Sequence, residues 1–135
     1  MSRFRWVASS LTLAISCAHA GTDPADPAML RLASQSGCLT CHHIEATPPD
    51  PDAALPVGPA WEGVAARYRG QTGAVDQLTR TVLAGSSPYA SHWKGQASGL
   101  AMPPNAVAIS ESDARKLVAW ILQLEPNRQP AAPAR

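Results

Sequence analysis

The sequence predicts an all-α fold, built from about four short helices that are joined by long loops. In four separate segments, apolar residues recur every three or four positions, the spacing that places them on one face of a helix. No segment alternates apolar and polar residues as a half-buried strand does. The chain between these segments is rich in Gly and Pro, of which it has 9 and 13, and both residues are typical of loops and turns.

Length and composition limit the protein to one domain. The chain has 135 residues, of which 45% are hydrophobic and 16% charged, so it has enough apolar material for a packed core. This length excludes a large two-domain metabolic enzyme. Lys and Arg number 11 and Asp and Glu number 10, so the chain lacks the strong positive charge of a typical nucleic-acid binder.

The first twenty residues have the layout of a secretory signal peptide. Arg3 and Arg5 give a basic start, residues 6–15 form a mostly apolar run, and Ala18 and Ala20 supply small side chains on either side of His19 at a cleavage site. An apolar run of about 10 residues is much shorter than the roughly 20 residues that a membrane-spanning helix needs. We therefore expect that residues 1–20 direct export and are then removed.

Cleavage at this site would leave a mature chain that begins at Gly21. Its formal charge would change from +1 to −1, because the two arginines of the first segment are lost. A second interpretation is lipid attachment at Cys17, but residues 14–17 match a lipoprotein signal poorly. Anchoring at Cys17 is therefore the weaker of the two interpretations.

Residues 26–36 form the first predicted helix. Asp26 is a suitable N-cap, and Pro27 suits the first turn because its missing N–H is not needed there. Ala33 belongs to the apolar stripe of this helix, and Gly37 ends it.

The second predicted helix covers residues 60–69. Before it, residues 47–59 contain five prolines and are not expected to form regular structure. The apolar face of the helix is made by four residues: Trp61, Val64, Ala65 and Tyr68.

The third predicted helix covers residues 74–84. Asp76 lies near its positive end, and Gly85 follows its last residue. Its apolar stripe comprises three residues: Val75, Leu78 and Val82. Residues 86–109 are then expected to form a long loop.

Residues 111–124 give the clearest helical pattern. Ser110 and Asp113 have the spacing of a capping box at its start. Five residues form its apolar stripe: Ala114, Leu117, Val118, Ile121 and Leu124. The functional domain would thus span residues 21–125, with residues 126–135 as a flexible C-terminal tail.

Cys38, Cys41 and His42 form a Cys-x-x-Cys-His motif, which is the attachment signature of c-type haem. Two thiols three positions apart can form thioethers with the two vinyl groups of haem, and the imidazole of the next residue can reach the iron. Gly37 lets the chain pass close to the porphyrin. The expected export supports this interpretation, because covalent haem attachment takes place outside the bacterial cytoplasm. A large flat cofactor also explains how a chain with four Trp, two Tyr and one Phe fills its core.

Three other chemistries fit these cysteines less well. A thioredoxin-like redox pair needs strands around it, and none is predicted. A zinc site needs four ligands, which Cys38, Cys41, His43 and His92 would supply only at irregular spacing. A disulfide between Cys38 and Cys41 would close a very small loop and stabilise little.

Met102 is the best candidate for a second iron ligand. It lies in residues 99–105, where two prolines follow it and stiffen the loop that would hold its thioether against the iron. A lone methionine more often fills a core, and Met29 in the first helix fits that role. His92 is the alternative ligand and would make the iron bis-histidine.

Taken together and in this order, four motifs resemble those of a small bacterial class I cytochrome c of the c551/c552 type. The resemblance covers residues 26–124. The motifs are the residues 38–42 (CLTCH), 57–61 (VGPAW), 102–105 (MPPN) and 117–122 (LVAWIL).

The resemblance implies the class I cytochrome c fold, in which about four helices surround one covalently bound haem and the first and last helices cross. It implies that Cys38 and Cys41 carry haem c through thioethers. It also implies that His42 and Met102 are the axial ligands of the iron.

Three residues would support this haem according to the same resemblance. The Pro59 carbonyl would accept a hydrogen bond from the His42 ring, which fixes the orientation and the basicity of the ring. Asn105 would support the Met102 loop, and Trp93 would lie near a haem propionate.

The chain departs from the compact members of this family in its loops. Residues 46–55 look like an insertion, and residues 91–101 form a longer loop that places Trp93 nine residues before Met102. Ala33 stands where a larger aromatic residue often packs, so more of that contact would fall to Trp120.

The function that follows is one-electron transfer in the periplasm, without catalysis. Two protein ligands leave no open position on the iron for oxygen or peroxide. Donor and acceptor would be other redox proteins, which dock near Cys38 and the Met102 loop through apolar and weakly polar patches, because a near-neutral chain steers partners little. The alternative is a haem c subunit of a periplasmic dehydrogenase complex, with the two longer loops at the interface. We expect a monomer in the first case, with no nucleic-acid partner and no membrane span.

Overall fold

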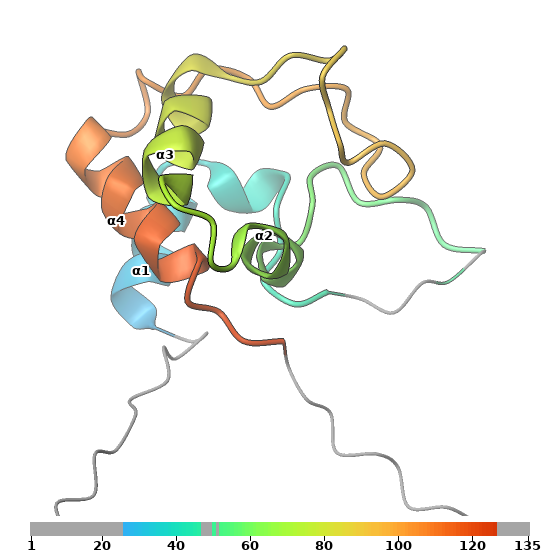
Figure 1. Ribbon diagram of the computed structural model, residues 1–135, viewed down its shortest axis with the longest axis horizontal. Coiled ribbons are helices and arrows are strands. Elements are labelled where there is room, and N and C mark those ends of the chain that lie inside the picture. Colours follow the sequence, from blue (N-terminus) through green and yellow to red (C-terminus); the bar gives the residue numbers. More distant parts are fainter. Residues whose placement is uncertain (1–25, 47–49, 51, 127–135) are drawn as a thin grey trace, which may run out of the picture.

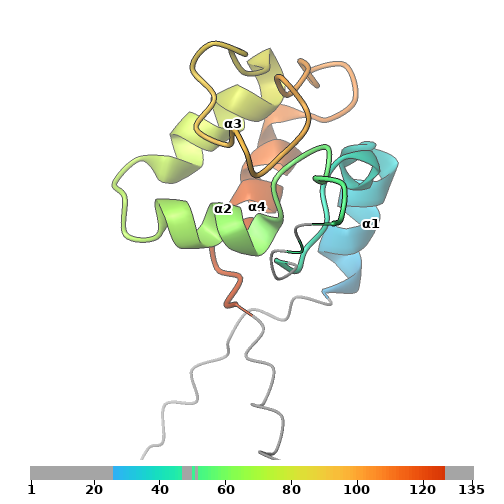
Figure 2. The same ribbon diagram turned by 90° about the vertical axis from the view of Figure 1, so that its right-hand side faces the viewer.

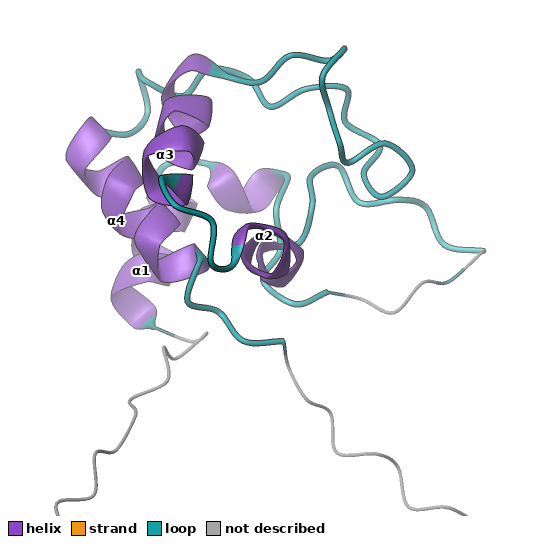
Figure 3. Cartoon of the chain, viewed as in Figure 1, coloured by secondary structure: helices purple, strands orange, loops and turns teal. Residues whose placement is uncertain are grey.

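A computed structural model describes residues 26–46, 50 and 52–126 of the chain. This part consists of four α-helices, one short 3₁₀-helix and loops, and no strand occurs within it (Figure 3). The all-α prediction is confirmed. The predicted signal segment lies outside the described residues, and so does the predicted tail apart from Pro126.

Helix α1 spans Pro27–Gln35 and begins as its sequence predicts. The Asp26 carboxylate accepts hydrogen bonds from the backbone N–H groups of Ala28 at 2.9 Å and Met29 at 3.3 Å, which satisfies two of the donors that a helix start leaves unpaired. Gly37 follows with a φ of 73°, a left-handed conformation that glycine adopts without strain.

The chain then forms the 3₁₀-helix η1, Cys38–Thr40, and later helix α2, Trp61–Tyr68. The 3₁₀-helix was not predicted, because three residues are too few to show a periodic pattern. Helix α2 is one residue shorter at each end than predicted. Its buried face includes Trp61, Ala65 and Tyr68, as expected.

Helix α3 spans Ala74–Ala84, the predicted range, and Gly85 ends it with a φ of 81°. Its buried side chains are Ala74 and Thr79, whereas the predicted stripe is only half-buried. Two members of that stripe, Leu78 and Val82, instead line a cavity that is described below. The helix therefore has two inner faces, one toward another helix and one toward the cavity.

Helix α4 spans Glu111–Ile121, so it ends three residues earlier than predicted. The Ser110 hydroxyl accepts a hydrogen bond from Asp113 N–H at 3.1 Å and caps its start. After Ile121, the chain continues in tight turns, in which Leu124 N–H bonds to the Ile121 carbonyl at 3.1 Å. The Leu124 side chain is still fully buried, so the apolar stripe extends beyond the helix itself.

Helix α4 packs against α1, α2 and α3, and most extensively against α3 (Figures 1 and 2). The expected contact between the first and last helices is therefore present. Ala33 of α1 is fully buried there, so this small side chain allows α1 to come close. The core consists of nine buried residues: Ala33, Trp61, Ala65, Ile109, Ala114, Leu117, Trp120, Ile121 and Leu124.

Two long loops cover the other side of the molecule (Figure 1). One connects η1 to α2, and the other connects α3 to α4. They meet where the Gly99 N–H donates a hydrogen bond to the Val57 carbonyl at 2.9 Å. These loops, rather than a fifth helix, enclose the cavity on that side.

Candidate functional site

The Cys-x-x-Cys-His motif lies in a single tight turn. The N–H groups of Cys41 and His42 both bond to the Cys38 carbonyl, at 3.3 and 3.0 Å. This turn follows Gly37, whose left-handed conformation redirects the chain after α1. Both thiols and the imidazole consequently border one cavity.

The His42 ring is held in one orientation by Pro59. Its Nδ1 lies 2.8 Å from the Pro59 carbonyl oxygen, and because a carbonyl only accepts, Nδ1 carries the hydrogen. The lone pair of Nε2 is then free to bind a metal. The predicted contact between His42 and Pro59 is present.

Gly58 makes this contact possible. A Cβ atom at position 58 would lie 2.8 Å from Cε1 and 2.9 Å from Nδ1 of His42, closer than real side chains approach. The Gly58 N–H also donates to the Cys41 carbonyl at 2.8 Å. The loop before α2 therefore closes directly over the His42 ring.

The surroundings of His42 favour the neutral ring that a metal ligand requires. Burial lowers the pKa of His42, the hydrogen bond to Pro59 raises it in part, and the neighbouring His43 lowers it further. The Trp61 ring stacks on His42, with 6.0 Å between ring centroids and an angle of 25° between planes. The wall of the cavity that contains His42 is therefore in direct contact with the hydrophobic core, through Trp61.

Met102 is held by the end of α3. Its N–H donates to the Ser86 hydroxyl at 2.8 Å, and its carbonyl accepts from the Ser86 N–H at 2.9 Å. Gly85 gives the room for this pairing, because a Cβ there would lie 2.9 Å from the Met102 carbonyl oxygen. Two bonds from one serine fix the backbone of the predicted second ligand.

Asn105 braces the same loop from the other end. Its side-chain amide donates to the Pro103 carbonyl at 2.7 Å, and its backbone N–H donates to the Val82 carbonyl at 3.1 Å. Asn105 therefore links the loop to α3, as a supporting residue would.

The cavity between these segments has a volume of about 460 Å³, within the usual range of roughly 300–1,000 Å³ for sites that hold small molecules or cofactors. Cys38, Cys41 and His42 border it from one segment, and Met102 borders it from another. Most of the remaining lining is apolar, including Val64, Leu78, Val82, Leu117, Val118 and Ile121. Two thiols, a preoriented imidazole, a thioether and an apolar lining are the donor set and surroundings that fit haem c.

His92 and Trp93 form part of the cavity rim. Nε2 of His92 and the Tyr68 hydroxyl share a hydrogen bond at 3.1 Å, and the Arg67 guanidinium lies 5.7 Å from the centre of the Trp93 ring. Both side chains of the long loop are thus docked on α2. Trp93 is at the cavity, as its expected position near a haem propionate requires, and Nε2 of His92 is already hydrogen-bonded to Tyr68.

The alternative chemistries find little support in the described part of the chain. Cys38 and Cys41 are free thiols. Burial raises the pKa of Cys38, whereas a redox-active pair depends on a lowered one. No cluster of three or more His, Cys, Asp or Glu residues able to hold a metal ion occurs among residues 26–46, 50 and 52–126.

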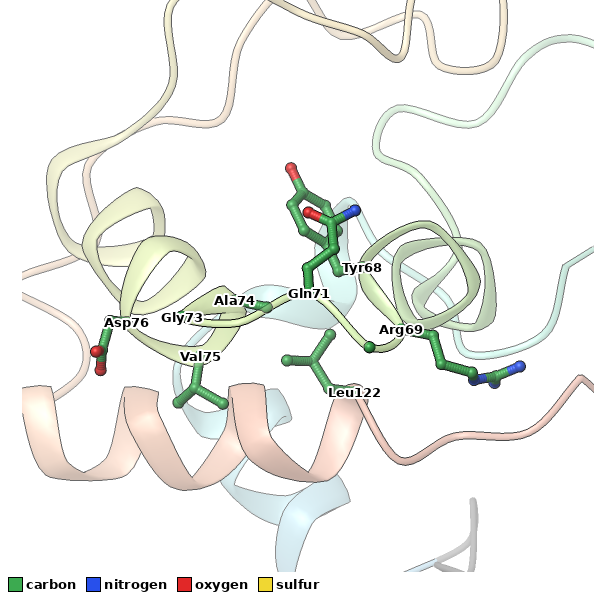
Figure 4. A pocket seen from close by; sticks show the side chains of 9 residues that line it. Tyr68, Arg69, Gln71, Gly73, Ala74, Val75, Asp76 and Leu122 are labelled. Atoms are coloured by element: carbon green, nitrogen blue, oxygen red, sulfur yellow. The ribbon is translucent and has the colours of Figure 1, made fainter.

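A second cavity, of about 370 Å³, lies at the turn between α2 and α3 (Figure 4). Val75 and Leu122 lie at its floor beside α4, and the Arg69 side chain points away from it. It shares only Tyr68 with the first cavity, and Leu122 is the single residue of the four sequence motifs that borders it. Its lining contains no cysteine, histidine or methionine.

Sequence analysis missed the residues that place the ligands. Ser86 and Gly99 were not singled out at all, and Gly58 and Gly85 were named only as part of the 57–61 motif and as the end of a helix, because the importance of all four comes from contacts with other segments of the chain. A glycine directly beside a proline-rich segment was the available signal at Gly58. Nothing local marks Ser86 as the partner of Met102.

Comparison with known proteins identifies the class. Residues 31–125 match the cytochrome c family, and the chain belongs to that family. Together with the relatives described next, this match makes it a small class I cytochrome of the c551/c552 type, whose members carry one covalently attached haem c.

Several relatives are similar over most of their length. The chain is 44% identical over 101 residues to cytochrome c-551 of Allochromatium vinosum, covering 75% of this chain and 90% of that protein. It is 34% identical over 95 residues to cytochrome c-552 of Hydrogenobacter thermophilus, covering 70% and 80%. The crystal structure of wild-type Nitrosomonas europaea cytochrome c552 superposes with a TM-score of 0.53 at 34% identity, covering 69% and 95%. These relatives are electron-carrying cytochromes, and the class I fold is confirmed.

Proposed function

We propose that this protein is a periplasmic one-electron carrier in which Cys38 and Cys41 bind haem c and His42 and Met102 are the axial ligands of its iron. The observation that carries the proposal is the shared cavity. Two thiols and a preoriented imidazole border it from one segment, and a thioether on a separately braced loop borders it from another.

The bound haem would supply the change between ferric and ferrous iron. The chain would supply rigidity on both sides of it: Pro59 holds the His42 ring, and Ser86 holds the backbone of Met102. Because a rigid site changes little between the two oxidation states, little reorganisation would oppose electron transfer. A thioether ligand and an apolar cavity favour ferrous iron and so a high reduction potential.

Absence of catalysis is part of the proposal. With protein atoms at both axial positions, oxygen and peroxide would find no open coordination site. Neither substrate pocket nor acid–base pair is required for electron transfer. Each of the four sequence motifs contributes residues to the cavity that would hold haem.

Export of residues 21–125 to the periplasm is supported by the layout of residues 1–20. None of the helices in the described residues has the length and apolar character needed to cross a membrane. The redox partners would then be other periplasmic proteins.

The alternative, a fixed haem subunit of a periplasmic dehydrogenase complex, is favoured by one observation. Leu55, Val57 and Leu100 are all exposed, Leu100 by 80%, and they lie on the two loops that connect η1 to α2 and α3 to α4. Apolar residues on such loops suit a permanent interface better than a free surface. Size-exclusion chromatography of a native periplasmic extract separates the two cases, since a free carrier elutes as a small protein.

Visible spectra of the purified native protein test the proposal. We expect the sharp reduced bands of haem c, a ferric spectrum of low-spin iron with a weak long-wavelength sulfur-to-iron band, and haem that stays on the chain in a denaturing gel. A protein without bound haem, or with high-spin iron open to added ligands, would contradict the proposal.

A further inference from the structure

The loop that connects η1 to α2 and the loop that connects α3 to α4 are joined to each other by backbone hydrogen bonds. Ser98 N–H donates to the Pro56 carbonyl at 2.8 Å, and Gly99 N–H donates to the Val57 carbonyl at 2.9 Å. The Ser98 hydroxyl also donates to the Pro56 carbonyl, at 3.2 Å. We call this pairing of residues 56–57 with residues 98–99 the loop clasp.

The loop clasp connects the segments of the two axial ligands. On one side, Val57 precedes Gly58, which bonds to Cys41, and Pro59, which accepts the hydrogen bond from His42. On the other side, Gly99 lies three residues before Met102. Met102 is therefore held toward α3 by Ser86 and toward the His42 segment by the clasp.

Gly99 is the residue that lets the two backbones come this close. A Cβ atom at position 99 would lie 2.5 Å from the Val57 carbonyl oxygen, well inside the distance that real Cβ atoms keep. The obstructing atom belongs to the backbone, so no side-chain rotation relieves it. Any other residue at this position would have to open the clasp.

We propose that Gly99 is a positioning residue for Met102, which keeps the thioether at the iron by closing the clasp between the Met102 loop and the His42 loop. This inference rests on the proposed His42/Met102 ligation. Opening the clasp would leave Ser86 as the nearest restraint on the loop before Met102. The Met102-bound state would then lose population to states in which the sixth position of the iron is open.

Gly99→Ala in the haem-loaded protein tests this role, and Gly63→Ala is the matched control. Gly63 lies within α2, and a Cβ there meets no atom within 4 Å. A steric clash of the kind that Gly99→Ala introduces against the Val57 backbone typically shifts a conformational population about tenfold or more. We expect ferric Gly99→Ala to bind potassium cyanide about tenfold more tightly than the wild type does. As the pH is raised, the variant should lose its sulfur-to-iron band at a lower pH than the wild type. Gly63→Ala should match the wild type in both measurements.

Ser98→Ala provides a second variant in case Gly99→Ala does not fold. It removes the hydroxyl bond to Pro56 and leaves the backbone intact, so the same changes should appear at smaller size. Unchanged cyanide affinity and an unchanged band in a folded Gly99→Ala protein, or in Ser98→Ala when Gly99→Ala fails to fold, would overturn the role of the clasp. A wild-type protein that lacks the sulfur-to-iron band would instead refute the proposed ligation itself, so the two failures are distinguishable.

Discussion

The rings of Trp61 and Trp120 meet edge to face, with 5.7 Å between their centroids and an angle of 86° between their planes. This arrangement is favoured by the charge distribution of aromatic rings. It ties the start of α2 to the end of α4. Because Trp61 also stacks on His42, the same contact connects the hydrophobic core to the proposed iron ligand.

Truncation of Trp120 should therefore cost much of the stability of the fold. Trp120 is buried in the core, and replacing a buried Trp by Ala typically costs about 3–5 kcal/mol. We expect Trp120→Ala to lower the free energy of unfolding in guanidinium by about this amount. Val107→Ala is the control, because Val107 is fully exposed and should change stability by less than about 0.5 kcal/mol. Equal effects of the two changes would contradict the packing described above.

Gly58→Ala should disturb the iron through His42. The added Cβ would displace the His42 ring from the Pro59 carbonyl, a hydrogen bond that makes the ring a stronger donor. A weaker donor supports ferric iron less, so the reduction potential should rise, as a redox titration would measure. Unfolding should also require less denaturant.

The same substitution in the middle of α2 should act in the opposite sense on stability. Gly63 has open space around its Cα, and alanine in a helix is more stable than glycine by roughly 0.5–1 kcal/mol. Gly63→Ala should thus leave the potential unchanged and raise the unfolding midpoint. If Gly58→Ala changes the reduction potential and the unfolding midpoint no more unfavourably than Gly63→Ala does, the tight contact between Gly58 and His42 does not influence the iron.

Local sequence patterns predicted the helices well where the helix is regular. The bounds of α3 agree because Gly73 and Gly85 flank it and both adopt positive φ. At α4 the prediction was three residues too long, since Leu124 continues the apolar stripe although the backbone has already turned. At Leu124 the side chain is buried although the backbone is no longer helical, and the apolar pattern of the sequence reports only the burial.

The residues that carry the chemistry of the site could be predicted from the sequence, but the residues that hold them in place could not. Cys38, Cys41 and His42 form a contiguous motif, and the two prolines after Met102 marked it among the methionines. The contacts of Met102 with Ser86 and of Val57 with Gly99 join segments that are 16 and 42 residues apart. Such pairings depend on how the loops close, and no periodicity records them.

Covalent attachment should depend on both cysteines of the motif. Thioethers survive denaturation, so haem should stay with the wild-type chain after boiling in detergent and stain in the gel. The Cys38→Ser, Cys41→Ser double variant should lose the stain, while Cys17→Ser should keep it, because Cys17 belongs to the segment that we expect to be removed. Staining of the double variant would refute covalent attachment through these thiols.

Export should leave a mature protein that begins at Gly21. Mass spectrometry of the periplasmic fraction should find a chain with haem mass added and residues 1–20 absent, because the small residues Ala18 and Ala20 suit cleavage after Ala20. A diacylglyceryl group on Cys17 would instead place the protein at a membrane surface. Retention of residues 1–20 in the cytoplasm would exclude both routes.

Met102→Ala should open the sixth position of the iron. Water or a stray side chain would replace the thioether, so the sulfur-to-iron band should disappear and cyanide or carbon monoxide should bind more readily. The reduction potential should fall, because a thioether supports ferrous iron more than ferric iron. Stability should fall as well, since the iron–sulfur bond would tether residues 99–105 in addition to the hydrogen bonds from Ser86 and Asn105.

His92→Ala separates this assignment from bis-histidine iron. His92 borders the same cavity, but its Nε2 shares a hydrogen bond with the Tyr68 hydroxyl, and a nitrogen engaged there does not also bind iron. His92→Ala should therefore keep the native spectrum and nearly the native potential, and should release only Tyr68. If Met102→Ala keeps the native ferric spectrum and His92→Ala loses it, then either Nδ1 of His92 binds the iron or the hydrogen bond from Nε2 to Tyr68 breaks when haem binds. His92 would then be the sixth ligand.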